Sequence, residues 1–236
     1  MVKASIFIAT HNKMSALANT LYSINRQKTT FPFEVCVVDD ASDEWPYTLI
    51  VDMLPDIPLK FVRLNQNMGC GKSQIECLSI MAPNSNVIVL QSADVMYAGD
   101  DVLEKLVRNL EPMVATMAEV RNVEIPQDLH EKWDSNLGHY LMEERLAETL
   151  DYINKDPRQP ERGLYQIKHT VFSGPRQPDP DRRWYFFLGA TRKEDLLKTC
   201  FRDSCFDVDL SASLHRVGIK VKYVDAVGIH QKHPVG

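Results

Sequence analysis

Four short apolar segments, each followed at once by polar residues, constrain the fold of this chain most strongly. They are residues 4–9 (ASIFIA), 33–38 (FEVCVV), 59–64 (LKFVRL) and 87–90 (VIVL). Helix-like sequence separates them, and the first such helix is expected to begin at Asn12 as its N-cap. Near-continuous apolar strands alternating with helices predict a parallel sheet covered on both faces. We therefore expect an α/β fold with a mostly parallel sheet flanked by helices.

The length and composition fit one domain of this kind. The chain has 236 residues, of which 44% are hydrophobic and 25% charged, and its net charge is −5. These values exclude disordered and collagen-like chains, and the mild acidity gives no support to general nucleic-acid binding. No apolar run reaches the length of a membrane span, so we expect a cytoplasmic protein without a transmembrane segment. The five cysteines form no CxxC pattern and are expected to be free thiols.

The polar residues that follow the strands carry the strongest functional signal. Thr10-His11-Asn12, Asp39-Asp40 and the segments 67–72 and 91–94 each come directly after a predicted strand. In open parallel sheets, ligands bind at the carboxyl ends of the strands, near the point where the strand order switches. We therefore expect these segments to form one ligand site. The alternative is that they are solvated turns.

A phosphate-binding motif is incomplete in the third of these segments. Gly71-Lys72-Ser73 resembles the end of a P-loop, but Gln66 stands where that motif requires its first glycine. A turn of small residues at a helix N-terminus still offers backbone N–H groups to a phosphate. Asn67, Gly69, Gly71 and Lys72 therefore remain candidates for ligand binding, with a simple tight turn as the alternative.

Taken in order, these segments resemble the glycosyltransferases of the GT-A fold, most closely the inverting family 2. FEVCVVDDAS, NMGCGKS with its helix, and LLKTCFRDSCFDVDLSASLHRVG carry the resemblance, which covers residues 1–110 and 184–233. It implies a single GT-A (Rossmann-like) domain. Its parts would be a nucleotide-sugar-binding half at 1–110, an insertion with acceptor-side and lid character at 111–183, and a catalytic C-terminal half at 184–236.

The resemblance also implies a reaction and a set of donor contacts. A sugar would pass from a nucleotide-diphosphate sugar, which we expect to be UDP-linked, to a hydroxyl acceptor. Asp40 would accept a hydrogen bond from the uracil ring N–H, and His11 would stack on the base between Thr10 and Asn12. Asp39 or Asp43 would reach the ribose or hold the loop.

The fourth strand departs from the family pattern at the expected metal site. The family carries Asp-x-Asp there, whereas this chain has Gln91-Ser92-Ala93-Asp94. Asp94 is the expected metal ligand, and Gln91 or Ser92 would bind the ribose. His230 resembles the late histidine that completes the site, with His233 as a weaker candidate. Mn²⁺ or Mg²⁺ is the expected cofactor, since both ions keep waters and take phosphate oxygens as ligands.

Inverting transfer also requires a base that takes the proton of the acceptor hydroxyl. Asp207 matches the family's catalytic aspartate, and Asp209 is the second candidate, although Phe206 stands where the family has an acid. The alternative for Asp207 is helix capping.

The acceptor cannot be identified from the sequence. The basic, loop-rich segment 155–183 is the candidate acceptor-binding region, with a solvated lid as the alternative. Residues 184–188 and Gly189-Ala190-Thr191 would lie beside the donor sugar, and a core strand is the alternative for the former. A glycan, a lipid-linked sugar, a protein and a modified nucleic acid all remain possible acceptors. Two other functions stay open: a catalytically silent nucleotide-sugar-binding scaffold protein, and a sugar nucleotidyltransferase.

Overall fold

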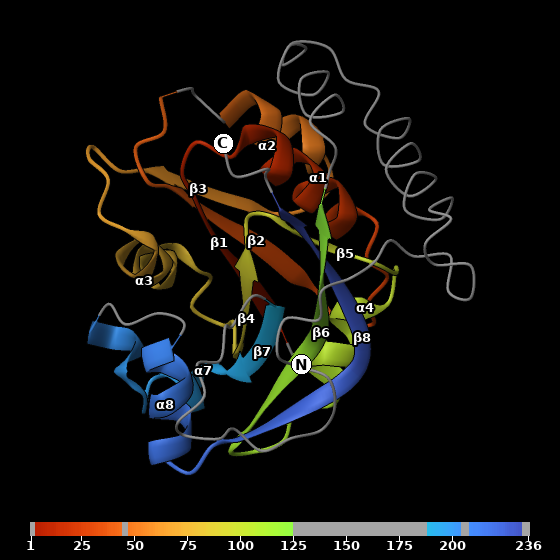
Figure 1. Ribbon diagram of the computed structural model, residues 1–236, viewed down its shortest axis with the longest axis vertical. Coiled ribbons are helices and arrows are strands. Elements are labelled where there is room, and N and C mark those ends of the chain that lie inside the picture. The colour runs from red at the N-terminus through yellow and green to blue at the C-terminus, as the bar shows by residue number, and fades with distance from the viewer. Residues whose placement is uncertain (1–2, 44–46, 125–187, 204–207, 233–236) are drawn as a thin grey trace.

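A computed structural model describes residues 3–43, 47–124, 188–203 and 208–232 of the chain. These residues form an eight-stranded sheet with helices on both faces, in the strand order β3-β2-β1-β4-β7-β6-β8-β5 (Figure 1). The expected α/β architecture is confirmed.

One half of the sheet is parallel and contains the four strands that the sequence predicts. Its strands are β1 (Ala4–Thr10), β2 (Phe33–Asp39), β3 (Leu59–Arg63) and β4 (Val87–Ser92). β1 pairs in parallel with both β2 and β4, and β3 continues outward from β2. The strand order therefore reverses between β2 and β4, which makes the carboxyl end of β1 the switch point of the sheet.

The other half of the sheet mixes strand directions. It contains β5 (Val95–Tyr97), β6 (Val114–Glu124), β7 (Leu188–Arg192) and β8 (Lys220–Lys232). β7 runs antiparallel to both β4 and β6, while the long strands β6 and β8 pair in parallel. Neither β5 nor β6 was predicted from the sequence. His230 lies within β8 and pairs with Val95.

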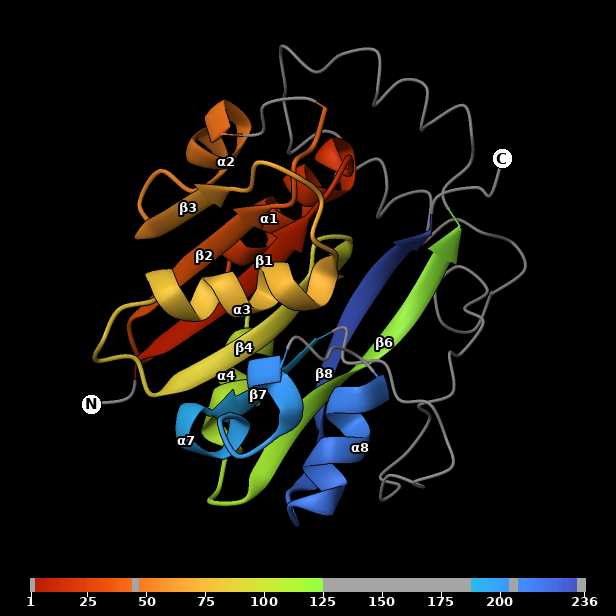
Figure 2. The same cartoon turned by 90° about the vertical axis from the view of Figure 1, so that its left-hand side faces the viewer.

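Helices cover the sheet on both faces. α1 (Met14–Asn25), α2 (Tyr47–Met53) and α4 (Val102–Arg108) pack on one face, and α3 (Cys70–Ile80) and α8 (Val208–Arg216) on the other (Figure 2). The short α7 (Lys193–Leu196) and the 3-10 helix η1 (Cys200–Asp203) lie on the α3 and α8 side. None of the described helices is both long and apolar enough to cross a membrane.

Alternating side chains of the central strands fill two separate cores. Ile6 and Ile8 of β1 enter the core under α1, while Phe7 enters the core under α3 and α8, and all three are fully buried. A strand with both faces buried reads as a continuous apolar run. This explains why the first strand was easy to predict from the sequence.

Two local predictions are wrong: the start of the first helix and the state of the cysteines. α1 begins after Lys13, which occupies the N-cap position, and Asn12 instead adopts a turn conformation with φ 51°. Cys200 is disulfide-bonded, whereas Cys36, Cys70 and Cys77 are not in disulfides. α4 follows Asp101 as its N-cap residue, and the carboxylate of Asp100 pairs with Lys28.

Candidate functional site

The site lies at the carboxyl ends of β1, β2 and β4, where the strand order reverses. The loops that leave these strands bring together two groups of polar side chains. One group surrounds Asp40 after β2, and the other surrounds Asp94 after β4. The β1–α1 loop, with His11, Asn12 and Lys13, contributes to both.

Asp40 is a buried carboxylate that fixes the loop leading into α3. Its Oδ1 accepts the backbone N–H of Met68 at 2.7 Å, and its Oδ2 accepts that of Gly69 at 2.8 Å. Its own backbone N–H donates to the carbonyl of Thr10. Only 3% of Asp40 is exposed. Asp40 therefore links the ends of β1 and β2 to the start of α3.

The β1–α1 and β2 loops are joined by a reciprocal amide contact. The side-chain amide of Asn12 donates to Asp43 at 3.0 Å, and the backbone N–H of Asp43 donates to Asn12 Oδ1 at 2.8 Å. His11 Nδ1 lies 2.9 Å from the Asp40 carbonyl, so this nitrogen carries the proton. The two loops therefore hold the His11 ring beside Asp40.

Asp39 supports this arrangement from inside the fold. It is fully buried, and its Oδ1 accepts hydrogen bonds from the backbone and hydroxyl of Ser42. Arg63 at the end of β3 approaches Asp39 Oδ2 at 3.4 Å and also donates to the Ser42 carbonyl. Of the two roles expected for Asp39, the contacts correspond to holding the loop. Thr10, paired with Asp39 in the sheet, is also buried.

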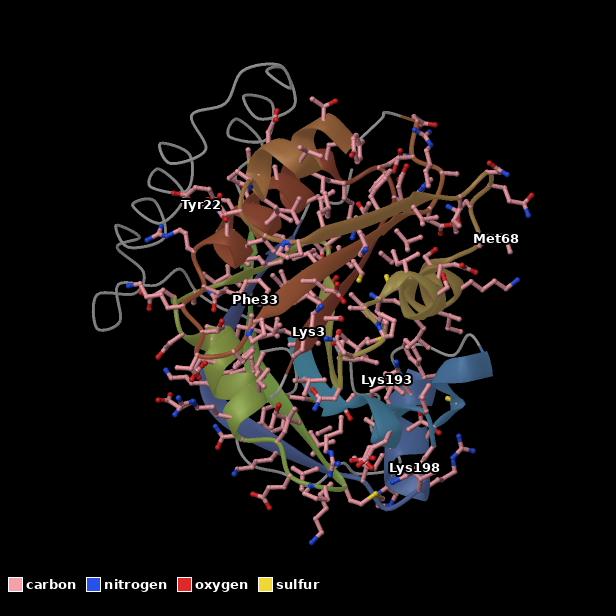
Figure 3. The ribbon with its side chains drawn as sticks, turned by 180° about the vertical axis from the view of Figure 1, so that it is seen from behind. Lys3, Tyr22, Phe33, Met68, Lys193 and Lys198 are labelled. Carbon is pink, nitrogen blue, oxygen red and sulfur yellow. The ribbon has the colours of Figure 1, made fainter. Side chains whose placement is uncertain are left out.

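The glycine turn before α3 is open to solvent. Gly69 has φ 86°, a conformation that favours glycine, and its N–H also donates to Asn67 Oδ1 at 3.0 Å. Gly71 and Lys72 lie in the first turn of α3, and Lys72 is exposed. Met68 projects from this loop at the outer edge of the molecule (Figure 3). Met68 and Lys72 line a groove of about 620 Å³.

The second group of polar residues surrounds Asp94, which is almost completely buried. Lys13 Nζ lies 2.5 Å and His230 Nε2 lies 3.4 Å from the same oxygen, Asp94 Oδ2. The hydroxyl of Ser92 donates to the other oxygen at 2.6 Å. Three elements therefore meet at one carboxylate: the start of α1, the turn after β4, and β8. We call Lys13, Ser92, Asp94 and His230 the Asp94 cluster.

The environment of Asp94 favours its ionised form. Burial acts to raise its pKa, but the hydrogen bond and charge of His230, followed by those of Lys13, hold the pKa well below its usual range. Asp94 is therefore a carboxylate at neutral pH, with cationic or hydrogen-bonding partners on both oxygens.

The end of β8 is fixed against α1, which sets the position of His230. Gln231 donates its backbone N–H to the Asp94 carbonyl at 2.9 Å. Its side chain accepts from Asn19 at 2.8 Å and donates to the Ala16 carbonyl at 3.3 Å. These contacts place the preceding residue, His230, beside Asp94.

Gln91 is placed differently from the ribose-binding role expected of it. Its side chain is fully buried, and its amide donates to the carbonyls of Ser92 and Val95 at 2.9 Å and 2.5 Å. It therefore supports the β4–β5 turn from beneath. Ser92 is partly exposed but donates to Asp94.

The Asp94 cluster offers two side chains of the kinds that a divalent metal takes as ligands, Asp94 and His230. Within the described ranges, no three His, Cys, Asp or Glu side chains gather as a metal-binding group. Asp94 is the one carboxylate in the segment Gln91-Ser92-Ala93-Asp94, because the other three side chains carry no acid. The oxygen that faces His230 also contacts the Lys13 ammonium. Asp94 and His230 lie close together, as expected, but Lys13 Nζ contacts the same Asp94 oxygen as His230 Nε2 does.

Several predicted residues lie outside the described part of the chain. These are Asp207, His233, the segment 155–183 and residues 184–187. Asp209 falls within α8, but its side chain is not described. Gly189 lies in β7, where it pairs with Leu90 of β4 and Met117 of β6.

Three residues that contact the site carboxylates were not predicted from the sequence: Lys13, Ser42 and Arg63. Lys13 was visible in Thr-His-Asn-Lys directly after the first strand, a position where a basic residue meets the ligand end of the sheet. Its partner Asp94 lies 81 residues away, so no local pattern joins the two. Ser42 follows an aspartate pair in a turn and carries no signal of its own.

Known proteins share this fold. The chain belongs to glycosyl transferase family 2, whose model matches residues 5–176. The uncharacterized glycosyltransferase YwdF of Bacillus subtilis (strain 168) is 28% identical over 160 residues, which cover 64% of this chain and 52% of that protein. Chondroitin synthase of Pasteurella multocida (strain Pm70) is 33% identical over 86 residues, covering 33% of this chain and 9% of that protein.

Solved glycosyltransferase structures share the fold. The mannosyltransferase PcManGT from Pyrobaculum calidifontis, in complex with GDP-Man and Mn²⁺, superimposes with a TM-score of 0.63 at 18% identity. It matches 99% of this chain and 58% of that chain. TarS residues 1–349 of S. aureus, in complex with UDP-GlcNAc, also give a TM-score of 0.63, at 14% identity, over 100% of this chain and 60% of that chain. The expected GT-A fold is confirmed.

The chain spans a quarter to about half of the length of the two Bacillus subtilis relatives, 26% of YfnE and 52% of YwdF. What is established is therefore a family 2 glycosyltransferase domain with the fold of nucleotide-sugar-binding enzymes.

Proposed function

We propose that this chain is an inverting glycosyltransferase that moves a sugar from a nucleoside-diphosphate sugar to a hydroxyl acceptor. The observation that carries the proposal is the meeting of the Asp40 loops and the Asp94 cluster at the switch point of a family 2 fold. This is the position at which open α/β sheets bind nucleotides.

The Asp40 side of the site is proposed to bind the nucleoside. Each oxygen of the Asp40 carboxylate accepts one backbone N–H, and each retains a second lone pair. Asp40 therefore has the capacity to accept the ring N–H of a pyrimidine while it still holds the α3 loop. The neighbouring His11 ring offers a flat surface for the base. UDP is our preferred donor nucleotide because uracil carries such a ring N–H.

The solved relatives support a nucleoside-diphosphate sugar as the donor, but they do not agree on its nucleobase. One was solved with GDP-Man and another with UDP-GlcNAc. A test of this proposal therefore includes both uridine and guanosine nucleotides.

The Asp94 side is proposed to receive the diphosphate. Mn²⁺ or Mg²⁺ was expected from the sequence, and two solved relatives contain Mn²⁺. Asp94 and His230 would hold such an ion, which would supply positive charge to the leaving diphosphate. The Lys13 ammonium shares the same Asp94 oxygen.

The transfer itself is proposed to be a single displacement. The acceptor oxygen forms a bond to the anomeric carbon as the bond from that carbon to the diphosphate oxygen breaks. The nucleoside diphosphate leaves with the electron pair, and Asp207 takes the proton of the acceptor hydroxyl. Asp209, two residues later in α8, is the second candidate base. The segment 155–183 remains the proposed acceptor-binding region.

One observation favours a second function. The β4–β5 turn has a buried Gln91 and an Ala93, so the site has a single carboxylate where the family has a pair. A chain of this kind that binds a nucleotide sugar without transferring it would act as a scaffold protein.

Turnover of a donor panel separates these functions. The protein is incubated with UDP-glucose, UDP-GlcNAc, UDP-galactose and GDP-mannose, with and without Mn²⁺, and release of the nucleoside diphosphate is measured. A transferase releases it from one donor class by slow hydrolysis, and proton NMR shows the released sugar with inverted configuration. Asp207→Asn should lower the rate by a factor of about 10²–10⁴, the contribution of a general base, while Asp209→Asn serves as the matched comparison. Donor binding without release by the wild type would favour the scaffold.

A further inference from the structure

We propose that the Lys13 ammonium is the cation that binds the donor diphosphate, so that donor binding at the Asp94 cluster needs no divalent metal. The inference rests on the proposed function, since it names the group that neutralises the diphosphate of the donor. In this account Asp94 orients Lys13 and His230 instead of holding an ion.

The contacts of Asp94 leave little room for a metal ligand role. Lys13 Nζ and His230 Nε2 both lie at Oδ2, at 2.5 Å and 3.4 Å, and the Ser92 hydroxyl occupies Oδ1 at 2.6 Å. A divalent ion on Oδ2 would have to displace the ammonium or stand beside it. Two cations at one oxygen repel each other, so the ion and Lys13 are alternatives at this position.

Lys13 is accessible to a ligand, whereas Asp94 is not. The Lys13 side chain is 43% exposed, while that of Asp94 is 5% exposed. An ammonium has three N–H donors, and Lys13 directs one of them to Asp94. The remaining donors can contact phosphate oxygens without breaking the ion pair. Asp94 thus holds the ammonium at the mouth of the site.

The start of α1 adds a second positive feature at the same place. Lys13 is the N-cap of this 12-residue helix, and its side chain makes no capping bond. The first turn also contains no acidic residue. The N-terminal N–H groups of a helix favour an anion, and no described side chain satisfies them here. A diphosphate beside Lys13 would meet both the ammonium and these N–H groups.

The missing carboxylates fit the same interpretation. A Mg²⁺ site at a phosphate ligand takes one or two carboxylates from the protein, and here Gln91 at the end of β4 and Ala93 in the turn leave Asp94 as the one carboxylate of this segment. Gln91 has become a buried support for the turn. The charge that a metal would bring is supplied by Lys13.

Calorimetric titration with UDP and with GDP, in EDTA and in Mn²⁺, tests the inference. The wild type should bind one of the two in EDTA with an affinity within about threefold of that in Mn²⁺. Lys13→Met should weaken this binding by about 10-fold to 100-fold, as expected when a charge-assisted hydrogen bond is lost. Lys13→Arg should retain most of it. Binding of the free nucleoside should not change, because the nucleoside has no phosphate for Lys13 to contact.

Two further variants make the result specific. Lys28→Met removes the same charge beyond the other end of α1, where Lys28 is exposed and pairs with Asp100, and it should leave nucleotide binding unchanged. Asp94→Asn distinguishes the two cations by the size of its effect relative to that of Lys13→Met. If Lys13 binds the diphosphate, Asp94→Asn should weaken binding in EDTA less than Lys13→Met does, because the ammonium keeps its charge and loses only the carboxylate that orients it; if a metal binds the diphosphate, Asp94→Asn should have the larger effect. Thermal melting of each variant confirms that it is folded.

The opposite pattern would overturn the inference. Binding that requires Mn²⁺, is lost in Asp94→Asn and is unchanged in Lys13→Met would show that a metal carries the diphosphate, while the proposed function would stand. Absence of binding by any nucleotide to the wild type in both conditions would overturn the proposed function and the inference together.

Discussion

Replacing Asp40 by alanine should loosen the loop that connects the end of β2 to the start of α3. The Asp40 carboxylate accepts two backbone N–H groups, from Met68 at 2.7 Å and from Gly69 at 2.8 Å. A hydrogen bond to a charged group contributes about 1.5–3 kcal/mol. Because Met68 and Gly69 are exposed, water can partly replace the lost acceptor, and the lower end of this range applies.

Two such bonds predict a loss of about 3 kcal/mol in the free energy of unfolding. For a chain of this length, 1 kcal/mol lowers the melting temperature by about 2–4 °C, so the expected decrease is about 6–12 °C. Denaturant unfolding followed by circular dichroism measures the free energy, and calorimetry measures the melting temperature. Asp40→Asn keeps one acceptor oxygen and should lie between the wild type and Asp40→Ala.

Asp43→Ala is the matched control, since Asp43 is an exposed aspartate three residues further on that contacts Asn12. It should cost no more than about 1 kcal/mol, as most exposed substitutions do. If Asp40→Ala is as stable as Asp43→Ala, the contacts of Asp40 do not hold the loop, and its assignment as the link between β2 and α3 is wrong.

Three other changes have defined outcomes. Glu34 lies at the end of the sheet opposite the candidate site, where its buried carboxylate accepts hydrogen bonds from the Ser5 hydroxyl and the Ala82 N–H. Glu34→Ala should lower the free energy of unfolding by about 2–4 kcal/mol and leave nucleotide affinity unchanged. Gly228→Ala would bring a Cβ to 2.9 Å from Val95, so the melting temperature should fall by an amount equivalent to about 1–3 kcal/mol. Asp94 has a lowered pKa in the folded state, so the stability that it contributes is present above about pH 4 and is lost as the pH falls further; Asp94→Asn should flatten this part of the stability profile.

The sequence predicts β1, β2 and β4 because these strands are buried on both faces. β1, β2 and β4 are continuous apolar runs that end in polar loops, which is the local signature of such strands. β6 was not predicted because apolar and polar residues do not alternate regularly in Val114–Glu124. Its pairing with β7 and β8 defines it as a strand. The part of β8 that contains His230 is likewise defined as a strand by its pairing with β5 and β6.

The same distinction between local pattern and distant contacts applies to the residues of the site. Asp40 and Asp94 are found from the sequence because each follows an apolar strand. The partners that determine their roles come from elsewhere in the chain: Met68 and Gly69 for Asp40, and Lys13 for Asp94. A residue type at a strand end thus predicts where a ligand binds. Which cation meets that ligand depends on contacts between distant segments.

The central claim is that the carboxyl ends of β1, β2 and β4 bind a nucleoside diphosphate, and a thermal-shift titration with UDP, GDP, CDP and ADP tests it most directly. A nucleotide that binds the native state at 100 times its dissociation constant stabilises it by about 2.7 kcal/mol, which corresponds to a rise of about 5–11 °C in a chain of this length. We predict such a rise for one nucleotide, with UDP preferred, and its reduction in Asp40→Asn relative to that variant's own ligand-free melting temperature. If none of the four nucleotides raises the melting temperature, with or without Mn²⁺, the assignment of this site to a nucleotide-sugar donor is contradicted.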